Sequence, residues 1–386
     1  MSMPSTQSGT RFTDLHQQVR LTASEFVKRH LLPHIQDWEE QGEFPREIYR
    51  LAGEAGLLGI GYPERFGGTG ENDVFMKLAA SEEMMRCTSG GLMASLFSHD
   101  IALPPIVNWA KPEIQEKVVP EVLRGEKIAA LAITEPGAGS DVANIQTRAV
   151  KKDGFYHVTG NKMFITSGVR ADYYTVAVRT GGPGYTGISL LLIEKGTPGF
   201  QVSKSLKKTG WWASDTAELS FDDCKVPEQN LIGGENAGFI IIMQNFLRER
   251  LALSAMAYMT AEIAYEAARD YAKQRKAFGR EIMGFQVTRH KLVDMATQVD
   301  IAKEYCYQVA EKIQNGTAPI EQVAMAKNFS TQIAESVTRE AVQIFGGMGY
   351  MRESVVDRLS RDARILAIGG GTTEVMKELI AKQLKL

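Results

Sequence analysis

The chain of 386 residues has little cysteine, no long apolar run and almost no net charge. Its three cysteines lie far apart and form no CxxC pair, which argues against a disulfide framework or a cysteine-ligated zinc site. No apolar stretch approaches the roughly 18–20 residues that a membrane-spanning helix needs, so we expect no membrane insertion. The 44 basic residues are balanced by 46 acidic ones. This balance excludes a broadly basic surface, and we expect no nucleic-acid partner.

Generic catalytic motifs are also missing. The sequence contains no GxSxG elbow, no Walker loop and no HExxH pair. His30 and His34 are four residues apart, but Pro33 lies between them and no third ligand is near, so we predict no metal site. The N-terminal segment has neither the apolar core of a signal peptide nor an arginine-rich presequence. We therefore expect a cytoplasmic, bacterial protein, although a mitochondrial matrix protein without its presequence would look the same.

Three sequence patterns follow one another and predict an α+β multidomain protein. Residues 1–128 repeat apolar positions every three or four residues, which predicts an N-terminal all-α domain. Residues 129–237 contain short β-branched runs and a hairpin signal at Asp153-Gly154, which predict a middle antiparallel β-barrel or sandwich. Residues 238–386 predict a C-terminal four-helix bundle. The helices expected for this bundle are Leu251–Arg275, Phe285–Gln314, Pro319–Phe345 and Thr373–Leu384.

Two segments of the β region are rich in glycine and hydroxyl groups. Leu131–Asp141 is a short apolar run that ends in such a loop, and Lys162–Gly168 repeats the theme with an aromatic residue before a Thr-Ser pair. Loops of this kind present backbone N–H and hydroxyl groups to an anion or a heterocycle. The same composition is also typical of an ordinary turn at the end of a strand. The residues alone favour the turn.

These segments belong to a larger set of motifs that resembles the acyl-CoA dehydrogenase family. The motifs that carry the resemblance are Leu131–Asp141, Phe164–Thr166, Gln274–Arg280, Gln343–Tyr350, Arg361–Arg364 and Gly369–Glu374. They occur in the order and spacing of the family over nearly the whole chain. The resemblance implies a helical domain, a β-barrel and a four-helix bundle, with FAD as cofactor. It also implies an acyl-CoA substrate, electron-transferring flavoprotein as acceptor, and a homotetramer.

The resemblance also assigns residues to the cofactor. Thr134 and Thr166 would bond the isoalloxazine edge beside Phe164, and Ser140 would lie where the flavin pyrophosphate meets the substrate. A second group would contact the FAD of a neighbouring subunit or its adenine side. The full set of expected cofactor positions is Leu131, Ile133, Thr134, Gly139, Ser140, Phe164, Ile165, Thr166, Arg275, Phe278, Gln286, Gln343, Gly346, Gly347, Thr372 and Glu374.

The catalytic base is displaced relative to most members of the family. The glutamate of their Tyr-Glu-Gly-Thr loop is replaced here by Gly370, which cannot accept a proton but whose N–H can still donate to the thioester oxygen. Glu249 occupies the helix position that the long-chain and isovaleryl branches use, so we predict that Glu249 is the base. Its alternative is an ordinary ion pair with its flanking arginines. Glu374 is a weaker candidate, because its counterpart faces the cofactor.

The predicted function is FAD-dependent α,β-dehydrogenation of an acyl-CoA to the trans-2-enoyl-CoA. Ser140, Arg250 and Gly371 are expected to bind the substrate, and long-chain and branched or terpenoid acyl groups both fit the resemblance. Small residues at Gly90, Gly91 and Ala94 favour a deep acyl pocket. An acyl-CoA oxidase or flavin monooxygenase of the same fold is one alternative, and a catalytically silent acyl-CoA-binding protein is another.

Overall fold

The first part of the chain is helical, as predicted. The computed structural model describes residues 11–70, 73–317 and 319–386. The helices before the sheet are α1 (Asp14–Phe26), α2 (Ile35–Gln41), α3 (Glu47–Glu54), α4 (Val74–Met85), α5 (Gly90–Leu96), α6 (His99–Ala102), α7 (Pro104–Trp109) and α8 (Pro112–Leu123). The start of α5 is capped by Ser89, whose side chain accepts a hydrogen bond from Leu92 N. None of the described helices is long and apolar enough to cross a bilayer.

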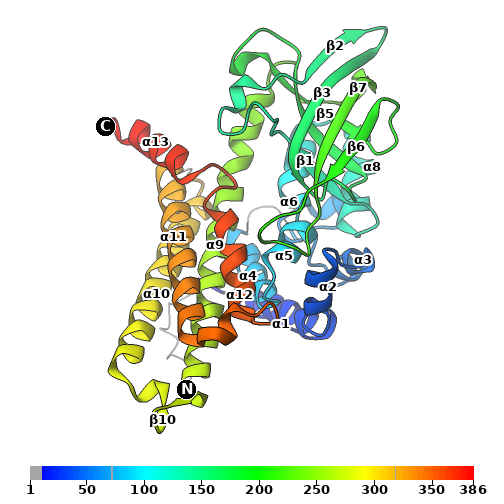
Figure 1. Cartoon of the computed structure of the whole chain (residues 1–386). Coiled ribbons are helices and arrows are strands. Elements are labelled where there is room, and N and C mark those ends of the chain that lie inside the picture. The colour runs from blue at the N-terminus through cyan, green and yellow to red at the C-terminus, as the bar shows by residue number, and fades with distance from the viewer. Residues whose placement is uncertain (1–10, 71–72, 318) are drawn as a thin grey trace.

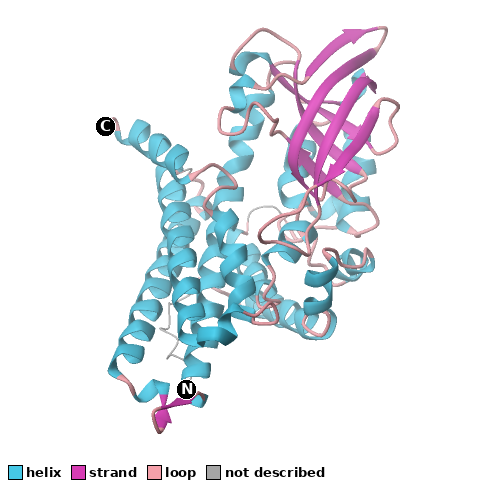
Figure 2. Cartoon of the chain, viewed as in Figure 1, coloured by secondary structure: helices cyan, strands magenta, loops and turns pink. Residues whose placement is uncertain are grey.

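The middle part of the chain forms one eight-stranded sheet (Figure 2). Its strands are β1 (Ala129–Ala132), β2 (Arg148–Lys152), β3 (Phe155–Thr166), β4 (Tyr173–Arg179), β5 (Ile188–Glu194), β6 (Phe200–Ser205), β7 (Thr216–Pro227) and β8 (Leu231–Ile232). Their order is β6-β7-β3-β2-β4-β5-β8, and β1 pairs with β4. The hairpin between β2 and β3 is confirmed, with positive φ at both Asp153 and Gly154.

One feature of the sheet differs from the expected antiparallel arrangement. Both β1 and β2 pair in parallel with β4, while the other pairings are antiparallel. Parallel neighbours need a long connection, and the β2–β3 hairpin between β1 and β4 supplies it. The parallel pairing places the ends of β1 and β4 at the same edge of the sheet.

The last part of the chain is a helical bundle that runs alongside the rest of the molecule (Figure 1). Its elements are α9 (Gly238–Gln274), β9 (Lys276–Ala277), β10 (Arg280–Glu281), α10 (Gln286–Gln314), α11 (Ile320–Phe345), α12 (Val355–Leu366) and α13 (Thr373–Leu384). Helices α9, α10, α11 and α12 lie side by side, whereas α13 packs mainly against α11 among them, near the opposite end of the bundle from β10.

The identity of the fourth bundle helix is a correction to the sequence analysis. The sequence pattern assigned this position to α13, but α12 packs against both α9 and α11. Helix α12 buries Arg358 and Asp362 on its inner face together with Val356, Leu359 and Leu366. Asp362 accepts hydrogen bonds from Gly90 N at 2.9 Å and Trp211 N at 2.6 Å. These bonds join the bundle to α5 and to the loop between β6 and β7.

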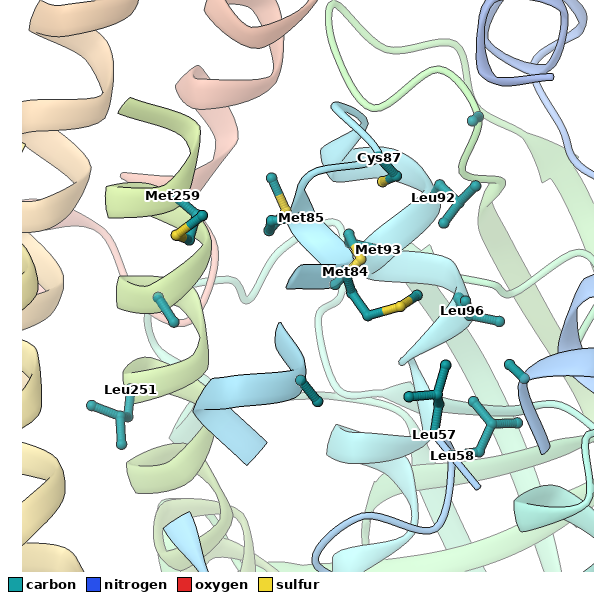
Figure 3. Close-up of a cluster of buried hydrophobic side chains, with 14 of the residues drawn as sticks. Leu57, Leu58, Met84, Met85, Cys87, Leu92, Met93, Leu96, Leu251 and Met259 are labelled. Atoms are coloured by element: carbon teal, nitrogen blue, oxygen red, sulfur yellow. The ribbon is translucent and has the colours of Figure 1, made fainter. Parts of the chain in front are cut away.

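A continuous apolar core joins the three parts. Methionines and leucines of α4 and α5 fill the space beside α9, as Figure 3 shows for Met84, Met93 and Met259. Because α9 packs against α4, α10, α11 and α12, it is fixed on several sides. The rest of the fold therefore fixes the position of α9 and of any functional residue on it.

Candidate active site

The loops after β1 and within β3 are held together by a buried ion pair. Lys162 Nζ donates to Ile133 O at 2.9 Å and to Glu135 Oε1 at 2.8 Å, and it is fully buried. Met163 N donates to Thr134 O at 2.8 Å, so the two segments lie directly side by side. Burial lowers the pKa of Lys162 to about 8, with Glu135 opposing the shift.

Phe164 lies in a bulge of β3 and its side chain points out of the sheet. The register of β3 against β7 shifts between Lys162 and Ile165, and Phe164 has a φ of +61° within this bulge. Bulges re-aim side chains, and they are frequent beside active sites. The phenyl ring is 63% exposed, while Thr134 and Thr166 are half-buried next to it. The arrangement offers an apolar ring and two hydroxyl groups, which suit a flat heterocycle with a polar edge.

Other predicted residues of these segments contribute differently. The side chains of Ile133 and Ile165 are buried in the core, so only their backbone groups could reach a ligand, whereas Leu131 is half-buried. Gly139 and Ser140 are exposed on the loop after β1. A Cβ at Gly139 would meet no atom within 4 Å, which leaves room for a ligand against the backbone.

Glu249 and Gly370 lie together, although one belongs to α9 and the other to the loop before α13. A Cβ built on Gly370 would be 3.6 Å from Glu249 Oε1 and only 2.6 Å from Leu253 Cδ1. Glu249 Oε2 is buried and has no hydrogen-bond partner in the described part of the chain. Burial raises the pKa of Glu249 to about 7, although Arg250 and Lys327 oppose the rise. The juxtaposition brings the predicted base to the loop from which the usual glutamate is missing.

The glycine loop exposes backbone donors. Gly370 and Gly371 have φ values of +65° and +108°, which favour glycine. Within the described residues, the N–H groups of both glycines lack a backbone partner. The carbonyl groups, by contrast, are bonded: Arg250 Nε donates to Gly370 O at 3.0 Å, and Lys327 Nζ donates to Gly371 O. Arg250 is therefore largely buried and faces the loop.

Glu374 has the opposite electrostatic character. It is exposed in the first turn of α13, and Thr372 caps this helix by accepting from Val375 N at 3.3 Å. The backbone N–H of Glu374 and the Thr372 hydroxyl lower the pKa of its carboxyl. A carboxylate with a lowered pKa is a poor proton acceptor.

The remaining predicted cofactor residues gather at the β9–β10 end of the bundle (Figure 1). Arg275 and Gln286 flank the short hairpin, and Phe278 at its tip is 96% exposed. The end of α11 lies at the same end of the bundle, because Phe345 stacks on Tyr271 of α9 at 4.2 Å between ring centroids. It carries Gln343, Gly346 and Gly347, which are exposed. Each chain thus holds this group far from Glu249 and Thr134.

The expected deep acyl pocket beside α5 is not supported at its two glycines. A Cβ on Gly90 would lie 2.5 Å from Trp211 Nε1, and a Cβ on Gly91 would lie 2.7 Å from Trp211 C. The space that these glycines leave is therefore filled by Trp211. This contact joins residues that are distant in sequence, so the pattern of small residues could not show it.

Two lysines of the site were not predicted. Lys162 and Lys327 are both fully buried, and both donate to the backbone of a loop that carries predicted site residues. Lys327 occupies an inward position of α11, four residues after Val323 in an otherwise small and apolar stretch. A lysine at a core position of a helix is the sequence signal that could have identified it.

Comparisons with known proteins agree with this architecture over the whole chain. Residues 13–126, 130–224 and 236–385 match the N-terminal, middle and C-terminal domains of acyl-CoA dehydrogenase. The mitochondrial long-chain specific acyl-CoA dehydrogenase of Mus musculus is 38% identical to this chain. The alignment covers 97% of this chain and 87% of the mouse protein. The mitochondrial isovaleryl-CoA dehydrogenase of Oryza sativa is 34% identical, and the alignment covers 98% of this chain and 93% of the rice protein.

Solved structures are similar to this chain as well. A probable acyl-CoA dehydrogenase from Mycobacterium abscessus is 50% identical and superposes with a TM-score of 0.95. The superposition covers 96% of this chain and 99% of the mycobacterial chain. The helical, β and helical parts, with an aromatic ring and a buried carboxylate beside glycine-rich loops, define a flavin-dependent oxidoreductase. The chain belongs to the acyl-CoA dehydrogenase family, and its cofactor is FAD.

Proposed function

We propose that this enzyme removes the α-proton of an acyl-CoA with Glu249 and forms the trans-2-enoyl-CoA. The observation that supports this proposal is the position of Glu249 against Gly370, together with its unpartnered, buried Oε2. A base whose pKa of about 7 matches neutral pH combines a large ionised fraction with a strong affinity for the proton. Glu374, with its lowered pKa, lacks this property.

In this proposal, Glu249 and the Gly370 N–H act on different atoms of the substrate. The Glu249 carboxylate accepts the proton from the α-carbon, and the electron pair of that C–H bond becomes the second bond between the α- and β-carbons. The N–H of Gly370 donates to the thioester oxygen, where negative charge develops. Bound FAD supplies the acceptor for the hydride that leaves the β-carbon. Thr134, Thr166 and Phe164 would hold its ring system, and Ser140 would lie between cofactor and substrate.

The proposed substrate is a long-chain or branched acyl-CoA. The support is the displaced base, which we expect in the long-chain and isovaleryl branches, and the similarity to relatives with those two names. Moving the carboxylate from the loop to α9 leaves Gly370 as the smallest possible residue beside the reacting carbons. We further propose electron-transferring flavoprotein as the acceptor and a homotetramer in which Arg275, Phe278 and Gln286 reach the FAD of a neighbouring subunit.

An anaerobic titration with a panel of acyl-CoAs tests the reaction and its substrate together. The panel runs from short straight chains through isovaleryl and citronellyl to palmitoyl, and the visible absorption of the flavin is followed. We expect bleaching, with the tightest response to a long or branched thioester. Failure of every thioester to bleach the bound flavin would contradict the proposal. Peroxide formed in step with turnover in air would instead assign the enzyme as an oxidase.

A further inference from the structure

Lys327 is a buried cation without a carboxylate partner. Lys327 is 0% exposed, and within the described residues it forms no ion pair with a carboxylate. Its hydrogen-bond acceptor is a neutral carbonyl, Gly371 O. Burying a charge without an ion pair is costly, so a lysine is retained at such a position at the expense of stability. The position therefore calls for a functional explanation.

Two cations bind consecutive carbonyl groups of the glycine loop. Arg250 Nε donates to Gly370 O, and Lys327 Nζ donates to Gly371 O. In a trans peptide, the C=O of one residue and the N–H of the next point in opposite directions. The N–H groups of Gly371 and Thr372 are therefore directed away from the two side chains. Arg250 and Lys327 therefore hold the two peptide groups that directly follow the Gly370 N–H, the group that we assigned to the thioester oxygen, and so restrain the loop on that side of Gly370.

The same two cations act on Glu249. Arg250 on α9 and Lys327 on α11 are the charged groups that oppose the rise in its pKa. In turn, burial and Arg250 lower the pKa of Lys327 to about 8, while Glu249 and Glu374 oppose this shift. Arg250 lies next to the base on its own helix, so Lys327 is the cation contributed from a different element.

We propose that Lys327 is a positioning residue, which orients the Gly370–Gly371 loop and keeps Glu249 ionised for proton removal. This inference rests on the proposed function of Glu249. The two effects are separable, because a glutamine at position 327 keeps a donor for Gly371 O but removes the charge. An arginine keeps the charge.

Exchange of the substrate α-proton with solvent tests the proposal without flavin reduction. The probe is an acyl-CoA whose fully substituted β-carbon carries no hydrogen, so that it can lose an α-proton but cannot be oxidised. The holoenzyme is incubated with this probe in D2O at a series of pD values, and deuterium uptake is measured by mass spectrometry. The flavin spectrum of each variant reports whether the protein is folded and loaded.

For Lys327→Gln, we expect the midpoint of the pH profile to rise by about one unit and exchange at neutral pH to fall roughly tenfold. The sign follows from the chemistry: without the cation, Glu249 holds its proton more tightly, and exchange recovers at alkaline pH. Lys327→Arg should keep the wild-type midpoint. Lys312→Gln, at an exposed position of the same bundle, is the matched control and should change nothing.

A wild-type midpoint in Lys327→Gln would overturn the proposal, whether its rate is unchanged or uniformly reduced, because a merely structural lysine does not move the profile. Should Lys327→Gln lack flavin, Lys327→Arg alone still tests the proposal, because it keeps both a donor for Gly371 O and the charge, and a shifted midpoint in that variant would overturn the proposal. Failure of the proposed function has a different signature. In that case Glu249→Gln would exchange the α-proton as fast as wild type.

Discussion

At the scale of single residues, the difference in burial between Glu249 and Glu374 decides which of these carboxyl groups is suited to accept a proton. Glu249 and Glu374 have the same chemistry, yet burial raises the pKa of the first, whereas the backbone N–H of Glu374 and the Thr372 hydroxyl lower the pKa of the second. The sequence showed that Gly370 replaces the usual glutamate and offered Glu249 as the alternative. Sequence could not show that the two residues lie side by side, because this depends on how α9 meets the loop before α13.

Restoring a carboxylate to the loop should not restore a second base. Gly370→Glu places a Cβ 2.6 Å from Leu253 Cδ1 at a positive φ, and it places a carboxylate next to Glu249. We expect the loop to shift and the rate of flavin bleaching to fall by more than about tenfold, since a misplaced donor is costly in the transition state. Anaerobic stopped-flow mixing measures this rate, and Gly369→Ala serves as a milder control. Wild-type or faster bleaching by Gly370→Glu would show that the loop tolerates a base.

At the scale of elements, the pattern of apolar residues predicted that the first and last parts of the chain are helical, and it predicted the β2–β3 hairpin. It did not identify α12 as a bundle helix, because the packing of α12 against α9 and α11 is a contact between distant segments. It also did not reveal the parallel pairing of β1 with β4, since register between distant strands is set by packing rather than by local sequence. The buried lysines were missed for a related reason: their partners, the Glu135 carboxylate and the carbonyl groups of Ile133 and Gly371, lie in other segments of the chain.

The Lys162–Glu135 ion pair holds together the loops after β1 and within β3, so we predict that breaking it weakens FAD binding. Lys162→Met leaves Glu135 buried with Gln146 N and Thr147 N as its donors but without a cation. Breaking a buried pair in this way costs about 3–5 kcal/mol. We expect a lower free energy of unfolding in urea and loss of FAD during gel filtration. Lys151→Met removes an exposed pair with Glu228 and should retain both. Full flavin retention in Lys162→Met would contradict the role given to this pair.

At the scale of the whole molecule, one chain separates its predicted FAD contacts into two groups. Thr134, Phe164 and Thr166 lie by the sheet, whereas Arg275 and Phe278 lie at the β9–β10 end of the bundle (Figure 1). Such a separation is what we expect if complete sites form only between subunits.

The proposed sharing of the site between subunits predicts that flavin retention depends on protein concentration. Arg275→Ala should release FAD on dilution at a higher protein concentration than wild type, because in this proposal the contact comes from a neighbouring chain. Fluorescence of released FAD measures the effect, with light scattering to follow the oligomer. Arg269→Ala, which removes an ion pair with Asp270 on the same helix, is the control. Concentration-independent retention in both variants would place a complete site within one chain.

The central claim is that Glu249 takes the α-proton, and one measurement tests it most directly. Anaerobic mixing of the FAD-loaded protein with its best acyl-CoA is followed at several pH values for wild type, Glu249→Gln and Glu374→Gln. We predict that wild-type bleaching rises with pH through a midpoint near 7, because the carboxyl must be ionised to accept a proton. Glu249→Gln should keep FAD but lose bleaching by about a thousandfold or more, whereas Glu374→Gln should keep the wild-type midpoint. Bleaching by Glu249→Gln at the wild-type rate would contradict the account.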